Sequence, residues 1–293
     1  MSSWIFDFGS NLGQNIEYFL LKSDKVVAVE ANPRLNVQVR EKFQRQILEG
    51  KLYVEECLVT SSSLIENAGR KQKFYVNKSD HRISSIHSPE FNDMHSWYQL
   101  VIYSKTVDEI IRNYMKVDDD LLYCKFDLEG FDKQAVQDMF VKGYFPKYVS
   151  LELNDPNGLD LLAASKHYNR FKLSFGSDIG KKIKTVNIYG SNGLQEFSFE
   201  VHSSGPVFDD LATSVFTLRG AKLVRKFKYR LGNWTDIHAA RNDKKIYLRG
   251  EFVFVLSLFF REVAQVIRRA LIKHLPRRTT SLIRESIRRM NLT

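Results

Sequence analysis

Short apolar runs alternate with amphipathic stretches along the first part of the chain. Residues 4–9 and 25–30 are apolar on both faces, which predicts strands buried within a parallel sheet. Residues 13–22 lie between them and repeat apolar side chains at the three- and four-residue spacing of a helix. This strand–helix–strand order is typical of the first half of an α/β fold.

The same pattern continues for two more elements and then breaks. Asn32 and Pro33 are a suitable N-cap and first residue for a helix that we expect to extend to about Leu48. A third strand is predicted over residues 51–59. Residues 60–99 are polar and rich in turn-forming residues, so we interpret them as an insertion over one end of the sheet.

Regular alternation resumes after the insertion. Thr106 and Glu109 have the spacing of a capping box at the start of a helix. The elements predicted beyond it are strands at 121–127 and 147–153, helices at about 131–140 and 159–170, and a hairpin formed by 183–189 and 196–201. Strands that alternate with helices predict an α/β fold with a mostly parallel, seven-stranded, doubly wound sheet of the Rossmann-like type.

Most of the net positive charge lies near the end of the chain. The net charge is +10, and residues 261–293 hold nine Arg or Lys and two acids, which accounts for +7 of it. Residues 252–275 also repeat apolar side chains at helical spacing up to Pro276, which predicts a basic amphipathic helical extension over 251–293. We therefore divide the chain into a main domain over 1–215, an irregular connecting segment over 216–250, and this extension.

The basic extension has three interpretations. Its helix could pack against the protein itself or a second copy, or it could lie on an anionic membrane surface. A nucleic-acid arm fits less well, because the extension has few polar side chains that could contact bases and no alternation of aromatic and basic residues. We expect self-association or peripheral membrane contact through this helix, and no nucleic-acid partner.

The cysteines and the hydropathy pattern indicate the cellular compartment of the protein. Cys57 and Cys124 lie in apolar runs without metal-ligand spacing, which predicts buried thiols in a reducing environment. No leader sequence precedes Trp4, and no uncharged run is long enough to cross a membrane. We expect a cytoplasmic protein.

The first group of residues with candidate chemistry is the turn after the first strand. Gly9 and Gly13 allow a ligand to approach the backbone closely, and Glu30, at the end of the second strand, could accept both hydroxyls of a ribose. The turn lacks the G-x-G-x-x-G pattern of dinucleotide binding, which disfavours NAD. A tight strand–helix turn without any cofactor is the alternative.

The second group lies at the ends of two central strands. Asp127 and Glu129 follow one strand, while Glu152 and Asn154 end the next. Because the carboxyl ends of parallel strands face the ligand crevice, we expect the four side chains to converge. Clustered carboxylates suit a general base, or Asp127, Glu152 and Asn154 could hold a divalent cation. The alternative is that the acids cap helices and pair with lysines such as Lys125.

Three motifs, in this order and spacing, resemble the signatures of FkbM-type methyltransferases. They are Asp7-x-Gly9-x-Asn11-x-Gly13, Val29-Glu30-Ala31-Asn32-Pro33 and Lys125-x-Asp127-x-Glu129-Gly130. The stretches Thr106–Ile110 and Ser203–Pro206 followed by Asp209-Asp210 also fit the pattern. The resemblance covers about residues 4–215. It implies a class I S-adenosylmethionine-dependent fold and methyl transfer to oxygen, frequently to a sugar or other polyol hydroxyl.

The resemblance also implies roles for the residues that match it. The methionine part of the cofactor would lie against Asp7, Gly9, Ser10, Asn11 and Gly13, its ribose against Glu30, its adenosine beside Asn32 and its adenine beside Cys57 and Leu58, with Asp127 and Glu129 next to the transferred methyl group. An alkyl hydroxyl is a poor nucleophile. We therefore predict Asp127 as the general base, with Glu129 and Glu152 as helper carboxylates or cation ligands.

Three functional hypotheses follow. The leading one is an S-adenosylmethionine-dependent O-methyltransferase that acts on a glycan or similar hydroxyl acceptor. A nucleic-acid methyltransferase is disfavoured, because adenine N-methylases need Asn or Asp followed by Pro-Pro-aromatic where this chain has Asp127-Leu-Glu-Gly130. A non-catalytic membrane- or partner-docking module that kept the fold is the third, and the intact Gly9, Gly13 and Glu30 argue against it.

Overall fold

The centre of the molecule is one seven-stranded sheet. The computed structural model describes residues 1–80, 84–86, 88, 95–152, 158–175, 185–190, 193–200, 203–211, 213–229 and 235–241. In spatial order the strands of the central sheet are β10 (Tyr168–Phe175), β13 (Thr235–Arg241), β9 (Tyr148–Glu152), β8 (Asp120–Phe126), β1 (Ser3–Phe8), β2 (Lys25–Glu30) and β3 (Leu52–Glu56). The pairs among β3, β2, β1, β8 and β9 are all parallel, whereas β13 is antiparallel to both β9 and β10.

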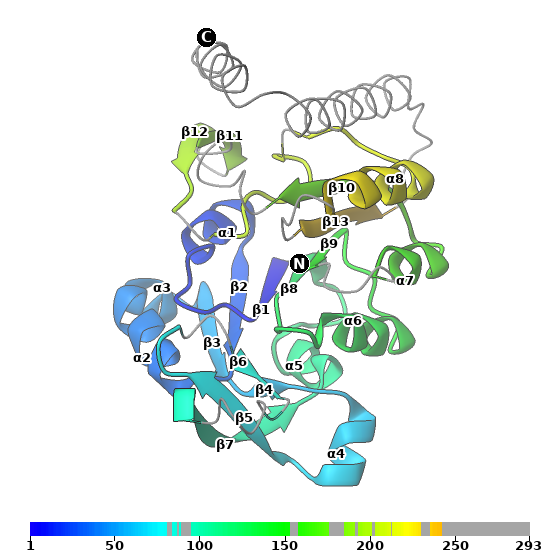
Figure 1. Ribbon diagram of the computed structural model, residues 1–293. Helices are drawn as coiled ribbons and strands as arrows, with labels where there is room; N and C mark the ends of the chain where they lie inside the picture. Colours follow the sequence, from blue (N-terminus) through cyan, green and yellow to red (C-terminus); the bar gives the residue numbers. More distant parts are fainter. Residues whose placement is uncertain are drawn as a thin grey trace, which may run out of the picture.

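Strand order reverses between β1 and β8. The chain builds outward from β1 through β2 to β3, then returns to place β8 and β9 on the other side of β1 (Figure 1). Ligands of open α/β sheets bind at such a switch point, beyond the carboxyl ends of the strands. This is the Rossmann-like class I methyltransferase architecture, and it confirms the predicted fold class.

Helices cover both faces of this sheet (Figure 1). One face buries α1 (Ile16–Lys22), α2 (Pro33–Lys42) and side chains of the hairpin of β11 (Thr185–Gly190) and β12 (Gly193–Ser198). The opposite face buries α5 (Val107–Tyr114), α6 (Asp132–Val141), α7 (Gly158–Ala164) and α8 (Leu218–Tyr229). Local signals place two of these helices as predicted, since Asn32 caps α2 with Pro33 at its first position and Thr106 with Glu109 forms a complete capping box on α5.

The predicted insertion is a second sheet. Its order is β4 (Leu58–Val59), β7 (Trp97–Lys105), β5 (Lys71–Asn77) and β6 (Ser84–Ser85), with α4 (Ser62–Ala68) between β4 and β5. A small apolar core of its own includes Phe74, Val76 and Ile102 together with Leu58. This sheet therefore stands beside the carboxyl ends of β2 and β3, where β4 continues the chain from β3 (Figure 1).

Two predicted elements in the first half are interrupted. The single strand over 51–59 is wrong, because the chain leaves β3 after Glu56 and pairs β4 with β7 of the second sheet. β4 is buried, but β3 is mostly half-buried and ends in Glu55 and Glu56, so the change of sheet follows these two acids. The helix predicted to reach Leu48 is divided at Phe43, whose ring is buried and whose φ of −112° departs from helical geometry; α3 (Gln44–Leu48) follows it.

The last third of the main fold departs further from prediction. The helix predicted over 159–170 ends at Ala164, since Lys166 has a φ of +61° and Tyr168 begins β10. The segment 216–250 is not irregular, because it contains α8 and β13. β13 even lies inside the central sheet, between β9 and β10.

Some predictions concern residues outside the described ranges. Asn154 and the basic extension at 251–293 are among them, so the extension stays a prediction. Among the helices within the described ranges, none is long and apolar enough to span a membrane.

Candidate active site

Gly9 is the point at which the site is built. It follows β1 with a φ of +83°, and its N–H and that of Ser10 donate to the Val29 carbonyl oxygen at 2.9 and 3.0 Å. A Cβ atom on Gly9 would lie 1.9 Å from the carbonyl oxygen of Asp127. The turn after β1 therefore touches the turn after β8, and only glycine permits that contact.

Gly13 serves packing. Its φ is +73°, and a Cβ there would meet Ile16 at 2.7 Å and Phe43 at 3.2 Å. The residue lines neither of the two recesses described below. A glycine is needed here because α1 packs close to the turn and leaves no room for a side chain.

Glu30 is held by backbone donors. Its Oε2 accepts from the Asn11 N–H at 3.0 Å and its Oε1 from the Asn32 N–H at 2.8 Å. Burial raises the pKa of this carboxyl, against the effect of those hydrogen bonds. Asn32 itself caps α2 by accepting from the Arg34 N–H at 3.1 Å and lines neither recess, so it acts on the site through Glu30.

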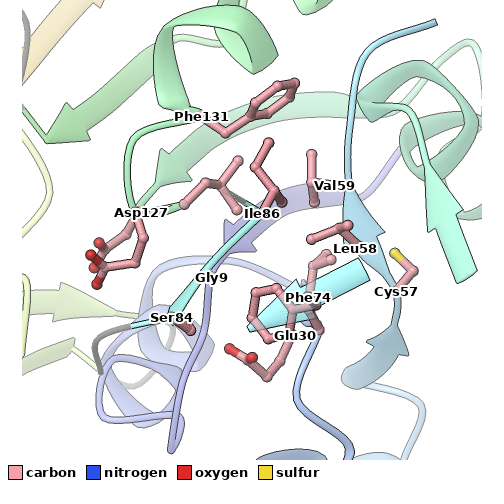
Figure 2. A pocket seen from close by; sticks show the side chains of 14 residues that line it. Gly9, Glu30, Cys57, Leu58, Val59, Phe74, Ser84, Ile86, Asp127 and Phe131 are labelled. Carbon is pink, nitrogen blue, oxygen red and sulfur yellow. The ribbon is translucent and has the colours of Figure 1, made fainter. Parts of the chain in front are cut away.

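An apolar slot opens above Glu30 (Figure 2). Its walls are Gly9, Val29, Glu30, Ala31, Cys57, Leu58, Val59, Phe74, Ser84, Ile86, Asp127, Leu128, Glu129 and Phe131. The predicted Cys57 and Leu58 lie here, while Phe74, Ser84 and Ile86 come from the second sheet. Burial raises the pKa of the Cys57 thiol, so this cysteine acts as an apolar wall and not as a nucleophile.

A buried lysine joins the two central turns. Lys125 Nζ lies 3.0 Å from Asp7 Oδ1, 3.1 Å from the Gly9 carbonyl oxygen and 3.4 Å from Asp127 Oδ2. Burial opposes its charge, but the two carboxylates raise the pKa of Lys125 above its ordinary value. Asp7 is fully buried behind this ammonium group and lines neither recess. Asp7 therefore holds the lysine that positions the turn.

A second recess, the acidic cavity, adjoins the slot at Gly9. Its volume is about 530 Å³. Its lining residues are Gly9, Ser10, Asn11, Gln14, Asn15, Asp80, Lys125, Asp127, Glu129, Glu152, Ser203, Ser204 and Asp236. The structure thus brings together Asp127, Glu129 and Glu152, as the sequence predicts. The loop that carries Ser204 is fixed to α1, since its N–H donates to Asn15 Oδ1 at 3.2 Å.

Some carboxyl groups of the cavity raise one another's pKa by electrostatic repulsion. Burial, followed by Asp127 and Glu152, raises the pKa of Glu129 to about 8. Burial and the same two neighbours also hold the pKa of Asp236 well above its ordinary value. Glu129 has a φ of +49°, an unusual conformation for a residue other than glycine. Glu129 is therefore suited to accept and hold a proton near neutral pH.

Asp236 is a site residue that the sequence analysis missed. It lies on β13 opposite Glu152 of β9, and it is 8% exposed. The sequence predicts no strand at β13, so Asp236 is not expected at the site. The available signal was the alternation of polar and apolar residues in Asp236-Ile-His-Ala239, which is typical of a strand.

The predicted cation site of Asp127, Glu152 and Asn154 stays a prediction, although Asp127 and Glu152 line the same cavity. Within the described ranges, no group of three or more His, Cys, Asp or Glu has the arrangement of a metal site. Asn154, the third predicted ligand, lies outside them.

Comparisons with known proteins give similarity in fold. No protein-family model matches the chain, and no curated protein matches it. Among solved structures, the methyltransferase FkbM from Methylobacillus flagellatus KT aligns with 12% identity over 59% of this chain and 40% of that chain, at a TM-score of 0.37. The alignment therefore spans less than half of that methyltransferase.

Two further solved structures are complexes with S-adenosyl-homocysteine. M. capricolum TrmK aligns with 10% identity over 99% of this chain and 89% of that chain, at a TM-score of 0.36. The O-methyltransferase from Bacillus cereus aligns with 10% identity over 82% of this chain and 74% of that chain, at a TM-score of 0.34. Similarity this low says nothing of activity or acceptor, and the fold assignment rests on the strand order.

Proposed function

We propose that this chain is an S-adenosylmethionine-dependent O-methyltransferase whose acceptor is a hydroxyl of a sugar or similar polyol. The observation that carries the proposal is the pair of recesses that meet at Gly9, at the switch point of the sheet. One is mostly apolar, with Glu30, Asp127 and Glu129 among its walls, and the other is polar and acidic. A nucleoside with a charged, polar substituent needs those two environments side by side.

The residues present fit that cofactor. The slot offers apolar walls for a base and the Glu30 carboxylate for ribose hydroxyls, with Cys57 and Leu58 at its far end. Gly9 leaves room where any side chain would collide with the Asp127 backbone. The Ser10 hydroxyl is buried without a hydrogen-bond partner and lines the acidic cavity, as expected of a group that awaits a ligand.

The chemistry follows from the chain's own carboxyl groups. When bound, the cofactor supplies a methyl group on a positively charged sulfonium sulfur. Glu129 accepts the proton of the acceptor hydroxyl, because a carboxyl with a pKa of about 8 holds a proton better than an ordinary one. Asp127, the base expected from sequence, is paired with Lys125 and orients the acceptor beside Glu152. Because the reaction is a displacement, positioning supplies much of the rate.

The acidic cavity also argues against a nucleic acid as the acceptor. Phosphate groups of a nucleic acid would face five carboxyl groups, and the nearby Lys125 is already bound to Asp7. The cavity therefore favours a neutral or cationic acceptor over a nucleic acid.

Calorimetry and methyl labelling test the proposal. The full chain should bind S-adenosylmethionine and S-adenosylhomocysteine, and it should transfer labelled methyl groups to members of a panel of sugars and polyols. Asp127→Ala and Glu129→Gln should retain binding and lose turnover by roughly a hundredfold or more, in line with the loss of acid–base catalysis. The exposed Asp118→Asn variant is the matched control.

The outcomes separate the hypotheses. Failure to bind either cofactor form would overturn the proposal and favour a docking module. Labelling of RNA or DNA but of no hydroxyl compound would overturn the acceptor class. Loss of turnover in a chelator, restored by Mg²⁺, would show a cation requirement that the sequence predicts through Asp127, Glu152 and Asn154.

A further inference from the structure

The clamped loop, residues 203–211, follows the hairpin of β11 and β12 and reaches the acidic cavity. It lines that cavity with Ser203 and Ser204. The slot shares Gly9 with the cavity but has neither serine in its walls. The two serines therefore belong to the side of the site that lies beyond the slot.

The start of α1 holds one side of the clamped loop. The Asn15 side chain accepts from the Ser204 N–H at 3.2 Å and donates to Ser204 Oγ at 3.4 Å. One helical turn further on, the buried Tyr18 hydroxyl donates to Asp210 at 2.6 Å and accepts from the Val207 N–H at 2.9 Å. Residues 15 and 18 are three apart, so both side chains reach the loop from one face of the helix.

The central sheet holds the other side of the loop. The buried Lys172 ammonium group on β10 donates to the carbonyl oxygens of Phe208 at 2.7 Å and Leu211 at 2.6 Å. The Tyr148 hydroxyl on β9 donates to Asp209. Because contacts from α1, β9 and β10 all end on this loop, the fold itself fixes its position at the cavity.

We propose that Ser204 determines acceptor specificity by binding a hydroxyl group of the acceptor, with Asn15 and Tyr18 as its positioning residues. The inference rests on the proposed function and deepens it. Asn15 donates to Ser204 Oγ, which leaves the Ser204 O–H to donate to an oxygen atom in the cavity. The methyl donor has a polar partner of its own at the turn after β1, where the buried Ser10 hydroxyl has no hydrogen-bond partner among the described residues.

A hydrogen bond from a fixed loop gives selectivity for a hydroxylated acceptor. A site built to bind a substrate hydroxyl rejects an analogue that lacks it, because the polar group of the site is then left unpaired. The clamped loop is already ordered, so binding costs little conformational entropy at Ser204. The hydroxyl bound by Ser204 is not the reacting one, so the contact acts on KM for the acceptor and not on kcat.

The test separates acceptor binding from donor binding in the full chain. The acceptor probes are glycerol, mannitol and methyl glucoside, and rates are measured on the one that the wild type methylates fastest. Ser204→Ala should raise the KM for that probe by about three- to tenfold, as expected for one neutral hydrogen bond. Its kcat and its calorimetric affinity for S-adenosylmethionine should stay within about twofold of the wild type.

Two variants serve as controls. Ser204→Thr keeps the hydroxyl group and should retain the wild-type KM within about twofold. Ser198→Ala removes an exposed hydroxyl on β12, outside the cavity, and should leave all three quantities unchanged.

Tyr18→Phe tests the positioning role. It keeps the buried ring and removes both hydrogen bonds to the loop, so the KM for the same probe should rise at least as much as in Ser204→Ala. Adding Tyr18→Phe to Ser204→Ala should raise the KM no further, because both changes act through one hydroxyl group. Additive effects would overturn the role of Tyr18.

The remaining outcomes are equally decisive. An unchanged KM in Ser204→Ala, or an equal rise in Ser198→Ala, would overturn the inference and leave the proposed function intact. A loss of S-adenosylmethionine affinity with an unchanged KM would assign Ser204 to the donor and also overturn it. If the wild type binds no cofactor or methylates no probe, the proposed function fails and the inference with it. If circular dichroism shows that Ser204→Ala does not fold, Ser204→Cys, a weak donor of similar shape, is measured against the same criteria.

Discussion

The apolar slot and the acidic cavity meet at Gly9 but are built in opposite ways. The slot's one buried acid, Glu30, accepts hydrogen bonds from two backbone N–H groups without any ligand. In the cavity, the buried Ser10 hydroxyl has no hydrogen-bond partner among the described residues, and Asp236 lies opposite another acid, Glu152. The polar groups of the slot therefore belong to the architecture, whereas those of the cavity are held ready for a ligand at a cost in stability.

Removal of Lys125 should have the largest effect on this arrangement. Lys125→Met leaves Asp7 buried without a counter-charge and frees the Gly9 carbonyl oxygen, so we expect a loss of about 3–5 kcal/mol in the free energy of unfolding. Urea denaturation followed by circular dichroism measures it.

The double variant Asp7→Asn with Lys125→Met is the control. It removes both charges and should recover part of the loss. Equal destabilisation in the single and double variants would show that the ion pair does not hold the junction of the two recesses.

Gly9→Ala should come next. The added Cβ would lie 1.9 Å from the Asp127 carbonyl oxygen at a φ of +83°, so backbone must move at the junction. We expect a loss of about 2–4 kcal/mol, with no calorimetric binding of either cofactor form. Gly143→Ala has a φ of +84° and open space around the Cβ, so strain alone should cost it about 1 kcal/mol. Equal losses would mean that the contact between the turns is unimportant.

Replacing an acid by its amide should change stability in opposite directions in the two recesses. Glu30→Gln replaces an oxygen that accepts from the backbone with an amide donor, so stability should fall by about 1–3 kcal/mol. Asp236→Asn removes a repelled carboxyl group and should be neutral or stabilising by about 0.5–1 kcal/mol. Thermal denaturation at pH 7 compares them. A destabilised Asp236→Asn would contradict the idea that the cavity's acids await a ligand.

The smallest effect is a dependence of stability on pH. The folded-state pKa of Glu129 is about 8, above the ordinary value of 4.5, so the folded protein binds the extra proton. Stability should therefore be greatest below pH 4.5 for this group and fall as the pH rises toward 8, with a slope well below the limit of about 1.4 kcal/mol per pH unit, because Glu129 is exposed and solvent screens its neighbours. Glu129→Gln should flatten that part of the curve in chemical denaturation. If the slope of stability against pH is unchanged in this variant, the titrating group is not Glu129.

The predictable half of the site is the half with local signals. A strand that enters a glycine turn, an N-cap such as Asn32 and the capping box of Thr106 each depend on residues close in sequence, and the structure confirms them. The meeting of Asp127, Glu129 and Glu152 was also predictable, since parallel strands end at one edge of a sheet.

The remaining half depends on pairings between distant segments. Asp236 reaches the cavity because β13 pairs with β9, and nothing near residue 236 announces that partner. The change of sheet between Glu56 and Leu58 depends on β7, a distant strand that pairs with β4, so the residues near Cys57 do not predict it. Gly13 and Asn32 match a cofactor motif, yet their contacts explain them as packing and capping residues.

The position of β13 has a consequence for how the protein is made. β10 is synthesised well before β13, yet its place in the central sheet lies beyond β13, next to no earlier strand. While the ribosome adds the residues from Phe175 to Arg241, a matter of several seconds at about 5–20 residues per second, β9 and β10 both expose an unpaired edge. The acidic cavity, which needs Asp236, is thus the last part of the site to form, and a nascent chain released before β13 would be a substrate for chaperones.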